Sequence, residues 1–183
     1  MNIKNIFFSL VLGLISGALT VYVPPKLDLY QIYSGNAVYF DIFPGLFFGL
    51  STCLAFVIIC GHTKWLGFVG FVLASIIAYM AAFWATLSTV DFLEPLSFFF
   101  GGCIGAFLSV MAVRWMLVSI SIAEVIKLSL WGGVLGFSVY IPIHFNDFGI
   151  LFLVWQPLML LAIMYFAKKY LTPEATLRPS STN

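Results

Sequence analysis

Charge is scarce in this chain of 183 residues, in which Lys, Arg, Asp and Glu together make up 8% of the sequence. An average soluble domain carries about 25% charged residues. The hydrophobic fraction is 62%, which is more apolar surface than a water-soluble fold of this length could bury. The eight basic and seven acidic residues nearly cancel and form no basic patch, so nucleic acid is not an expected partner. The composition predicts a protein whose excess apolar surface faces the lipid bilayer.

Residues that could carry catalysis or hold a metal are also few. The three cysteines lie in or at the end of apolar runs and show no CxxC spacing, which is typical of small buried residues. The sequence contains no H-E-x-x-H, no G-x-S-x-G and no phosphate-binding loop. We therefore expect no catalytic residue, no metal and no cofactor, and an enzyme is the least favoured class of function.

Six long apolar runs fill the chain instead. A membrane-spanning helix needs about 20 mostly apolar residues, and backbone polar groups in hydrocarbon must be paired within helices or closed barrels. The runs lack the alternation of barrel strands, so we predict an all-α polytopic membrane protein, a bundle of six transmembrane helices. The expected spans are 5–23, 39–60, 65–87, 96–117, 127–143 and 149–167. Residues 1–167 then form the transmembrane domain, and residues 168–183 form a polar cytoplasmic tail.

The basic residues predict how these spans are oriented. Loops on the cytoplasmic side of a membrane are enriched in Lys and Arg. If both termini are cytoplasmic, only Lys26 falls outside, and the other basic residues fall inside: Lys4, Lys64, Arg114, Lys127, Lys168, Lys169 and Arg178. The two histidines, His62 and His144, then lie on opposite faces and cannot share a metal ion. We expect a multi-pass protein of the cell membrane, most simply a bacterial inner membrane.

Small residues recur at a spacing of four along most of the spans. In lipid, ordinary hydrophobic burial does not draw helices together, whereas rows of small residues allow close van der Waals approach. This favours a helix-packing role, although such grooves could also hold a ligand, a second copy of the chain or the helix of another membrane protein. The candidate packing residues are Gly13, Gly17, Gly45, Gly49, Gly70, Ala74, Gly101, Gly105, Gly132 and Gly136.

The sixth span differs, because it carries a deep polar side chain, Gln156, between Trp155 and Pro157. Proline removes a backbone donor, so Pro157 should kink the helix or free a carbonyl near residue 153. A buried amide needs a partner. Gln156 either bonds the freed backbone, which is the favoured interpretation, or lines a ligand pocket with Trp155.

Polar residues of the predicted outer loops could add to such a pocket, although a solvated loop is the favoured interpretation for them. The candidates are Asp41, Glu94, His144 and Asp147. No acidic or basic residue falls in the middle of a span, which argues against a proton-driven pump with a carboxylate relay.

In length, number of spans and the small-residue stretch LGLISGAL (12–19), the chain resembles the substrate-binding subunits of energy-coupling-factor vitamin transporters. Such subunits use a small-residue face of the first helix to dock their partner. Two classes of function stay open. One is a small transporter or substrate-binding transport subunit with an outward-opening pocket between helices. The other is a non-catalytic subunit or assembly factor that docks another membrane protein through its glycine-rich faces.

Overall fold

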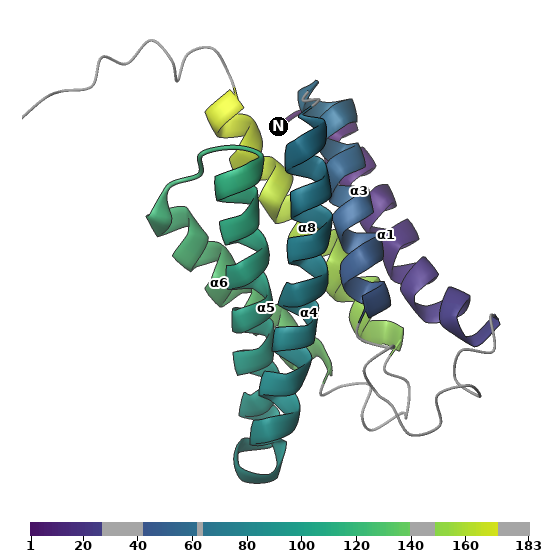
Figure 1. The fold of residues 1–183 in the computed structure, drawn as a ribbon, viewed down its shortest axis with the longest axis vertical. Coiled ribbons are helices and arrows are strands. Elements are labelled where there is room, and N and C mark those ends of the chain that lie inside the picture. Colours follow the sequence, from purple (N-terminus) through teal and green to yellow (C-terminus); the bar gives the residue numbers. More distant parts are fainter. Residues whose placement is uncertain (27–41, 62–63, 140–148, 172–183) are drawn as a thin grey trace, which may run out of the picture.

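The computed structural model describes residues 1–26, 42–61, 64–139 and 149–171, and the regular structure in these ranges is helical (Figure 1). The elements are α1 (Ile3–Lys26), α3 (Ile42–Cys60), α4 (Trp65–Leu93), α5 (Pro95–Met116), α6 (Ile122–Gly136), the short 3₁₀ helix η2 (Phe137–Val139) and α8 (Gly149–Leu171). The prediction of an all-helical protein is confirmed for these residues.

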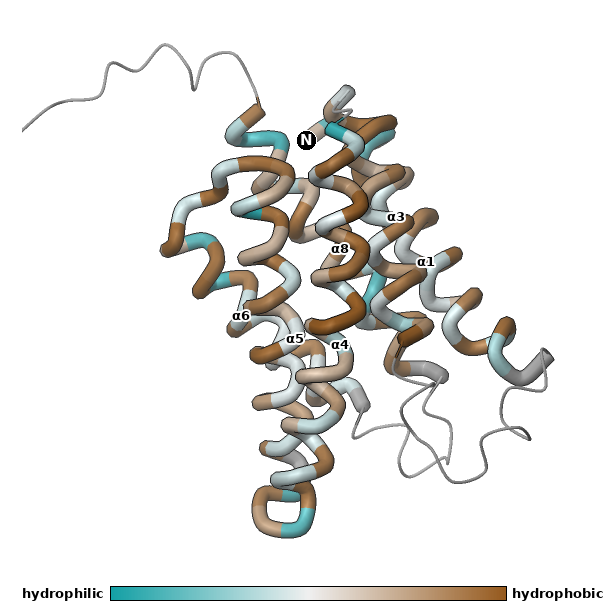
Figure 2. Tube along the Cα trace, in the orientation of Figure 1, coloured by the Kyte–Doolittle hydropathy of each residue, from teal (hydrophilic) through white to brown (hydrophobic). Residues whose placement is uncertain are grey.

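Within the described ranges, five helices are long and apolar enough to cross a membrane: Ile3–Pro24, Ile42–Cys60, Trp65–Leu93, Leu96–Met116 and Leu151–Leu171. Hydrophobic residues follow the helices along their lengths (Figure 2). Many of them point outward, and on α4 Leu66 is 90% exposed and Ile77 is 63% exposed. Such surface is stable only against lipid, because water would oppose its exposure. The structure therefore has the helices of an integral membrane protein.

The helices form a bundle in which each packs on its neighbours. α1 lies against α8 and α3, α3 lies against α4, α4 lies against α5, and α5 lies against α6, while the contact of α6 with α8 is smaller. The start of α1 and the end of α8 lie at the same end of the bundle, and the turn between α4 and α5 lies at the other end (Figure 1). The buried interior is mainly apolar, with Phe48, Phe71 and Met159 fully enclosed.

Helix α4 is longer than the sequence analysis predicts. Residues 88–93, expected in a connection, continue the helix to Leu93. Glu94 alone makes the turn, with φ of 39°, and Pro95 begins α5. Proline is well suited to the first position of a helix and disfavours helical conformation in the residue before it. The turn is closed by Ser97, whose backbone N–H donates to the Glu94 carbonyl at 3.0 Å.

Helix α6 begins earlier than predicted, within the segment 118–126 that was expected to be a connection. Ser121 caps it: its hydroxyl accepts from the Glu124 backbone N–H at 3.3 Å and donates to the Glu124 carboxylate at 3.1 Å. A Ser three residues before a Glu is a helix-start signal, and the apolar-run criterion does not detect it. At 15 residues, α6 is only about 22 Å long, shorter than the roughly 30 Å hydrocarbon core. The last part of the predicted fifth span, 140–143, lies outside the described residues.

Candidate functional site

Gln156 is the centre of a buried polar cluster. Its side chain is fully buried inside the bundle. The amide oxygen accepts a short hydrogen bond from the Ser16 hydroxyl of α1. The amide nitrogen donates to the Thr20 hydroxyl of α1 at 3.3 Å and to the Pro44 carbonyl of α3 at 3.4 Å. One side chain thus connects α8 to two other helices, whereas the favoured interpretation had it bonding the backbone freed by Pro157.

The close approach of α1 and α8 makes these bonds possible. Gly13 lies against the backbone of Pro157, and a Cβ added to Gly17 would lie 2.5 Å from the Phe152 carbonyl oxygen. Because Ser16 and Thr20 are four residues apart, they share one face of α1, close to that of the two glycines. Thr20 also donates to the Ser16 carbonyl at 3.0 Å, which orients its hydroxyl. The stretch from Gly13 to Thr20 therefore presents a small, polar face to Gln156.

Three aromatic rings lie beside the amide. The Trp155 ring centroid is 5.4 Å from that of Tyr79 on α4 and 5.6 Å from that of Phe48 on α3, and the last two are 5.9 Å apart. The Trp155 indole N–H donates to the Gly132 carbonyl of α6 at 3.2 Å, which fixes the ring. These spacings are in the range that aromatic pairs prefer.

Three buried hydroxyls of α3 and α4 make no hydrogen bond within the described residues: those of Thr52, Ser75 and Tyr79. The Tyr79 hydroxyl faces the Gln156 amide without reaching normal hydrogen-bond geometry. The Ser75 hydroxyl lies close to Gly49 of α3, 3.3 Å from where a Cβ on that glycine would stand. An unpaired hydroxyl in an apolar interior is unfavourable by about 1–3 kcal/mol. Beside Gln156, the Tyr79 hydroxyl thus keeps hydrogen-bonding capacity that the protein itself does not use.

The structure brings together only part of the predicted ligand set. Trp155 and Gln156 are both buried in the cluster. Glu94 is exposed in the turn between α4 and α5. Asp41, His144 and Asp147 lie outside the described residues.

Sequence reasoning missed Ser16, Thr20 and Tyr79. A signal for the first two was present, because Gly13, Ser16, Gly17 and Thr20 recur at the spacing of one helix face. No signal marked Tyr79, because its place depends on how α4 packs against α3 and α8.

The candidate packing glycines lie against other helices of the same chain. A Cβ on Gly45 would stand 2.5 Å from the Ile76 Cα of α4, and one on Gly105 would stand 3.0 Å from the Ala82 Cβ. Ala74 is partly buried against the core. The remaining glycines also lie against a residue of a neighbouring helix: Gly49 against Val72, Gly70 against Met116, Gly101 against Thr86, Gly132 against Ala106 and Gly136 against Phe98. The face of α1 that carries Gly13 and Gly17 is therefore covered by α8.

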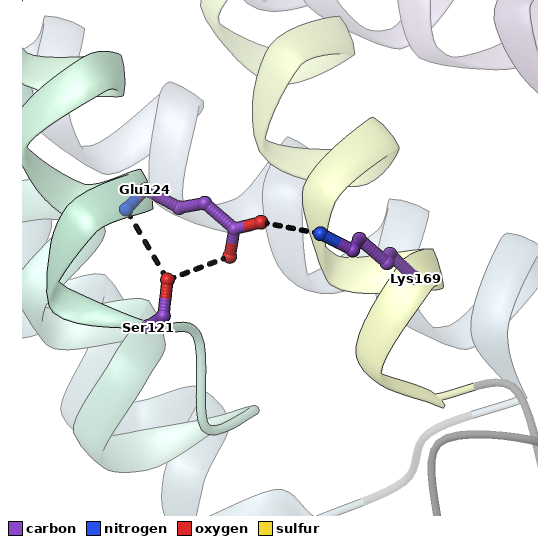
Figure 3. A network of polar contacts seen from close by, with 3 residues as sticks. All are labelled: Ser121, Glu124 and Lys169. Atoms are coloured by element: carbon purple, nitrogen blue, oxygen red, sulfur yellow. Dashed lines mark hydrogen bonds and ion pairs between the residues drawn. The ribbon is translucent and has the colours of Figure 1, made fainter.

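A second polar site joins the start of α6 to the C-terminal end of α8. Lys169 donates to the Glu124 carboxylate at 3.0 Å, and Ser121 donates to the other carboxylate oxygen (Figure 3). Glu124 lies before the predicted span 127–143. Burial alone would raise the pKa of the Glu124 carboxyl. Hydrogen bonds from Tyr170, Lys169 and Ser121 together outweigh this effect, so the pKa lies below its ordinary value of 4.5. This pair ties the two helices together where their contact is otherwise small.

No protein-family model matches the chain, and no curated protein or solved structure is significantly similar to it.

Proposed function

We propose that the protein is a small transporter, or the substrate-binding subunit of one, whose binding site forms around Gln156. The observation that carries this proposal is the buried polar cluster, in which the Tyr79 hydroxyl has no partner beside the bonded Gln156 amide, while the buried hydroxyls of Ser75 on the same helix and Thr52 on α3 also lack partners. Polar groups in membrane helices that face the bundle interior commonly mark the path of a solute. A solute with hydrogen-bonding groups would supply the partners that Thr52, Ser75 and Tyr79 lack.

The chemistry of the cluster favours an uncharged, polar solute. The side chains around Gln156 are hydroxyls, an amide and aromatic rings, with no charged group among those described. Neutral hydrogen-bonding groups would recognise a solute with donors and acceptors, and the rings of Trp155 and Tyr79 would favour one with a flat or apolar face.

The proposed pocket opens outward. In the six-span topology with cytoplasmic termini, α8 starts on the outer side, and Gln156 lies seven residues into it, about 10 Å from its start. Pro44 lies in the first turn of α3, and Thr20 lies in the outer part of α1. In this topology α6 provides the fifth crossing, and the protein belongs in a bacterial inner membrane.

The alternative function, a non-catalytic subunit or assembly factor, was expected to use the glycine-rich faces. Those faces are occupied by neighbouring helices of the chain. A partner, or a second copy in a homo-oligomer, would need another surface, so the geometry favours the transport proposal.

The unpartnered hydroxyls allow a test that separates folding from binding. Tyr79→Phe and Ser75→Ala remove groups that make no hydrogen bond, so we expect the melting temperature in mild detergent to stay within a few degrees or rise. If these hydroxyls hold a solute, the variants should lose it. The measurement is mass spectrometry of small molecules extracted from the purified protein, wild type against variants.

Ser109→Ala is the matched control, because the Ser109 hydroxyl is also buried and unpartnered but lies on α5. It should keep whatever the wild type carries. Wild-type protein without any enriched solute, or equal retention by all four proteins, would contradict a binding site at Gln156.

A further inference from the structure

A groove of about 460 Å³ runs along the surface of the bundle over α8, between the start of α1 and α6. Met1 and Ile6 line it from α1, Lys127 and Trp131 from α6, and Ala162 and Tyr165 from α8. On α8 it is lined by residues from Leu158 to Phe166, and Gln156 is not among them. The groove is therefore separate from the proposed solute site.

The lining is mainly apolar, and it includes Lys127 and the N-terminal residue Met1. Lys127 is the only charged side chain in it and is exposed. The acid nearest in sequence, Glu124, is one turn earlier on α6 but is buried and engaged by Lys169 (Figure 3). Lys127 thus gives the groove a positive charge that no carboxylate of the described residues neutralises.

The polar and apolar parts of the groove are arranged as at a membrane surface. Lys127 is five residues into α6, about 7 Å from the helix start, within reach of the headgroup region for a long lysine side chain. Trp131 is one turn further along the same face and is 44% exposed, and Tyr165 on α8 is 56% exposed. Tryptophan and tyrosine prefer the level of the headgroups. Beyond them, the groove offers only apolar atoms.

We propose that this groove is a binding site for an anionic phospholipid. The phosphate would pair with Lys127, and one acyl chain would lie along the groove over Ala162. Basic pockets between membrane helices bind anionic headgroups in this way. A zwitterionic lipid would fill the apolar part equally well but would gain less from the lysine, so the site should select for headgroup charge.

The test uses the full-length protein in a neutral detergent, titrated with phosphatidylglycerol or with phosphatidylcholine of the same acyl chains. Bound lipid is counted by native mass spectrometry, and thermal stability is measured in parallel. We expect one phosphatidylglycerol to bind more tightly than phosphatidylcholine. Lys127→Gln should weaken phosphatidylglycerol about fivefold, because one lysine contributes roughly that factor near an anionic lipid. Lys127→Arg should retain the preference.

Two further variants separate the parts of the site. Lys64→Gln removes an exposed lysine at the start of α4, which does not line the groove, and should keep the preference. Ala162→Phe should fill the apolar part and reduce binding of both lipids. Glycerol phosphate, which has no acyl chains, should not compete.

Three outcomes would overturn the proposal. The first is equal binding of the two lipids by the wild type. The second is an equal loss of phosphatidylglycerol binding in Lys64→Gln and Lys127→Gln, which would indicate that the lipid is attracted by positive charge in general and not by this groove. The third is a dimer that forms without lipid and is broken by Ala162→Phe, which would assign the groove to a second copy of the chain.

Discussion

The contact between α1 and α8 and the contact between α4 and α5 are both built on two glycines four residues apart, yet the glycines meet different surfaces. Gly13 and Gly17 lie against the backbone of α8. At the other contact, Gly101 lies against the Thr86 side chain and 3.0 Å from the Ala82 carbonyl oxygen, and Gly105 lies against the Ala82 methyl with the nearest backbone atom 3.8 Å from its added Cβ. The 2.5 Å contact with backbone leaves no room for a methyl group at Gly17, whereas the 3.0 Å contact between Gly105 and the Ala82 methyl needs a shift of only a few tenths of an ångström. The same sequence spacing therefore tolerates change very differently in the two places.

The two contacts also differ in their hydrogen bonds. At the α1–α8 contact, Gln156 bonds across the interface to Ser16 and Thr20. At the α4–α5 contact, the Thr86 hydroxyl bonds back to the Ala82 carbonyl of its own helix at 2.9 Å. Polar groups stabilise helix association in lipid only when they bond across the interface. The α1–α8 contact is thus held by packing and hydrogen bonds, and the α4–α5 contact mainly by packing.

The largest difference is expected from adding one methyl group to each contact. Gly17→Ala should destabilise the protein by about 2–3 kcal/mol, because the new Cβ would meet the Phe152 carbonyl at 2.5 Å. Gly105→Ala should change stability by less than about 1 kcal/mol, because the new Cβ would stand 3.0 Å from the Ala82 Cβ and the helices would need to separate by only a few tenths of an ångström. Both are measured by denaturant unfolding in detergent micelles. Equal losses would show that the two contacts are equivalent after all.

A middle-sized effect is expected from Gln156→Leu. The change leaves Ser16, Thr20 and the Pro44 carbonyl without their partner on α8. Measured hydrogen bonds between membrane helices average about 0.6 kcal/mol, so a loss of about 1–2 kcal/mol follows. Hydrogen exchange should show faster exchange in α1 and α8. Thr86→Val, which removes a bond within one helix, is the control and should cost less. A larger loss in Thr86→Val would reverse the distinction between the two contacts.

The smallest effect is expected at the Glu124–Lys169 pair. Lys169 is 66% exposed, so solvent screens the pair, and Glu124→Gln should cost no more than about 1 kcal/mol at neutral pH. Because folding lowers the Glu124 pKa below 4.5, the carboxylate stabilises the protein above that pH, and the stabilisation is lost as pH falls through the lowered pKa. The difference between wild type and Glu124→Gln, measured by thermal unfolding against pH, should therefore shrink below pH 4.5. A difference that stays constant down to acid pH would assign the pair no electrostatic role.

The residues explain where prediction worked and where it failed. The apolar runs placed α1, α3 and the body of α5 well, because twenty apolar residues in sequence have no stable place except a lipid-exposed helix. The search for apolar runs ended the predicted span of α4 too early, at the polar residues Ser88 and Thr89. Both hydroxyls bond within their own helix, so the helix continues through them. The search missed the start of α6 because a cap is set by two polar residues, Ser121 and Glu124, and not by hydropathy.

The candidate site was predictable in part. Gln156 stands out in any reading of the sequence, because an amide among apolar residues must find a partner. Which partner it finds depends on the pairing of α1 with α8, two helices at opposite ends of the chain. The unpartnered hydroxyls of Thr52, Ser75 and Tyr79 depend in the same way on how α3 and α4 meet α8.

By itself, the sequence determined that this protein is a helical membrane protein, because hydrophobicity and helix formation in lipid are properties of each segment alone. It also supplied the small residues at which helices could approach. Only the tertiary structure decided which helix each glycine meets, that the Gln156 amide joins α8 to α1 and α3, and that Lys127 stands in a groove without an acid. Those facts depend on distances between segments far apart in the chain, and such distances are set when all the helices pack together.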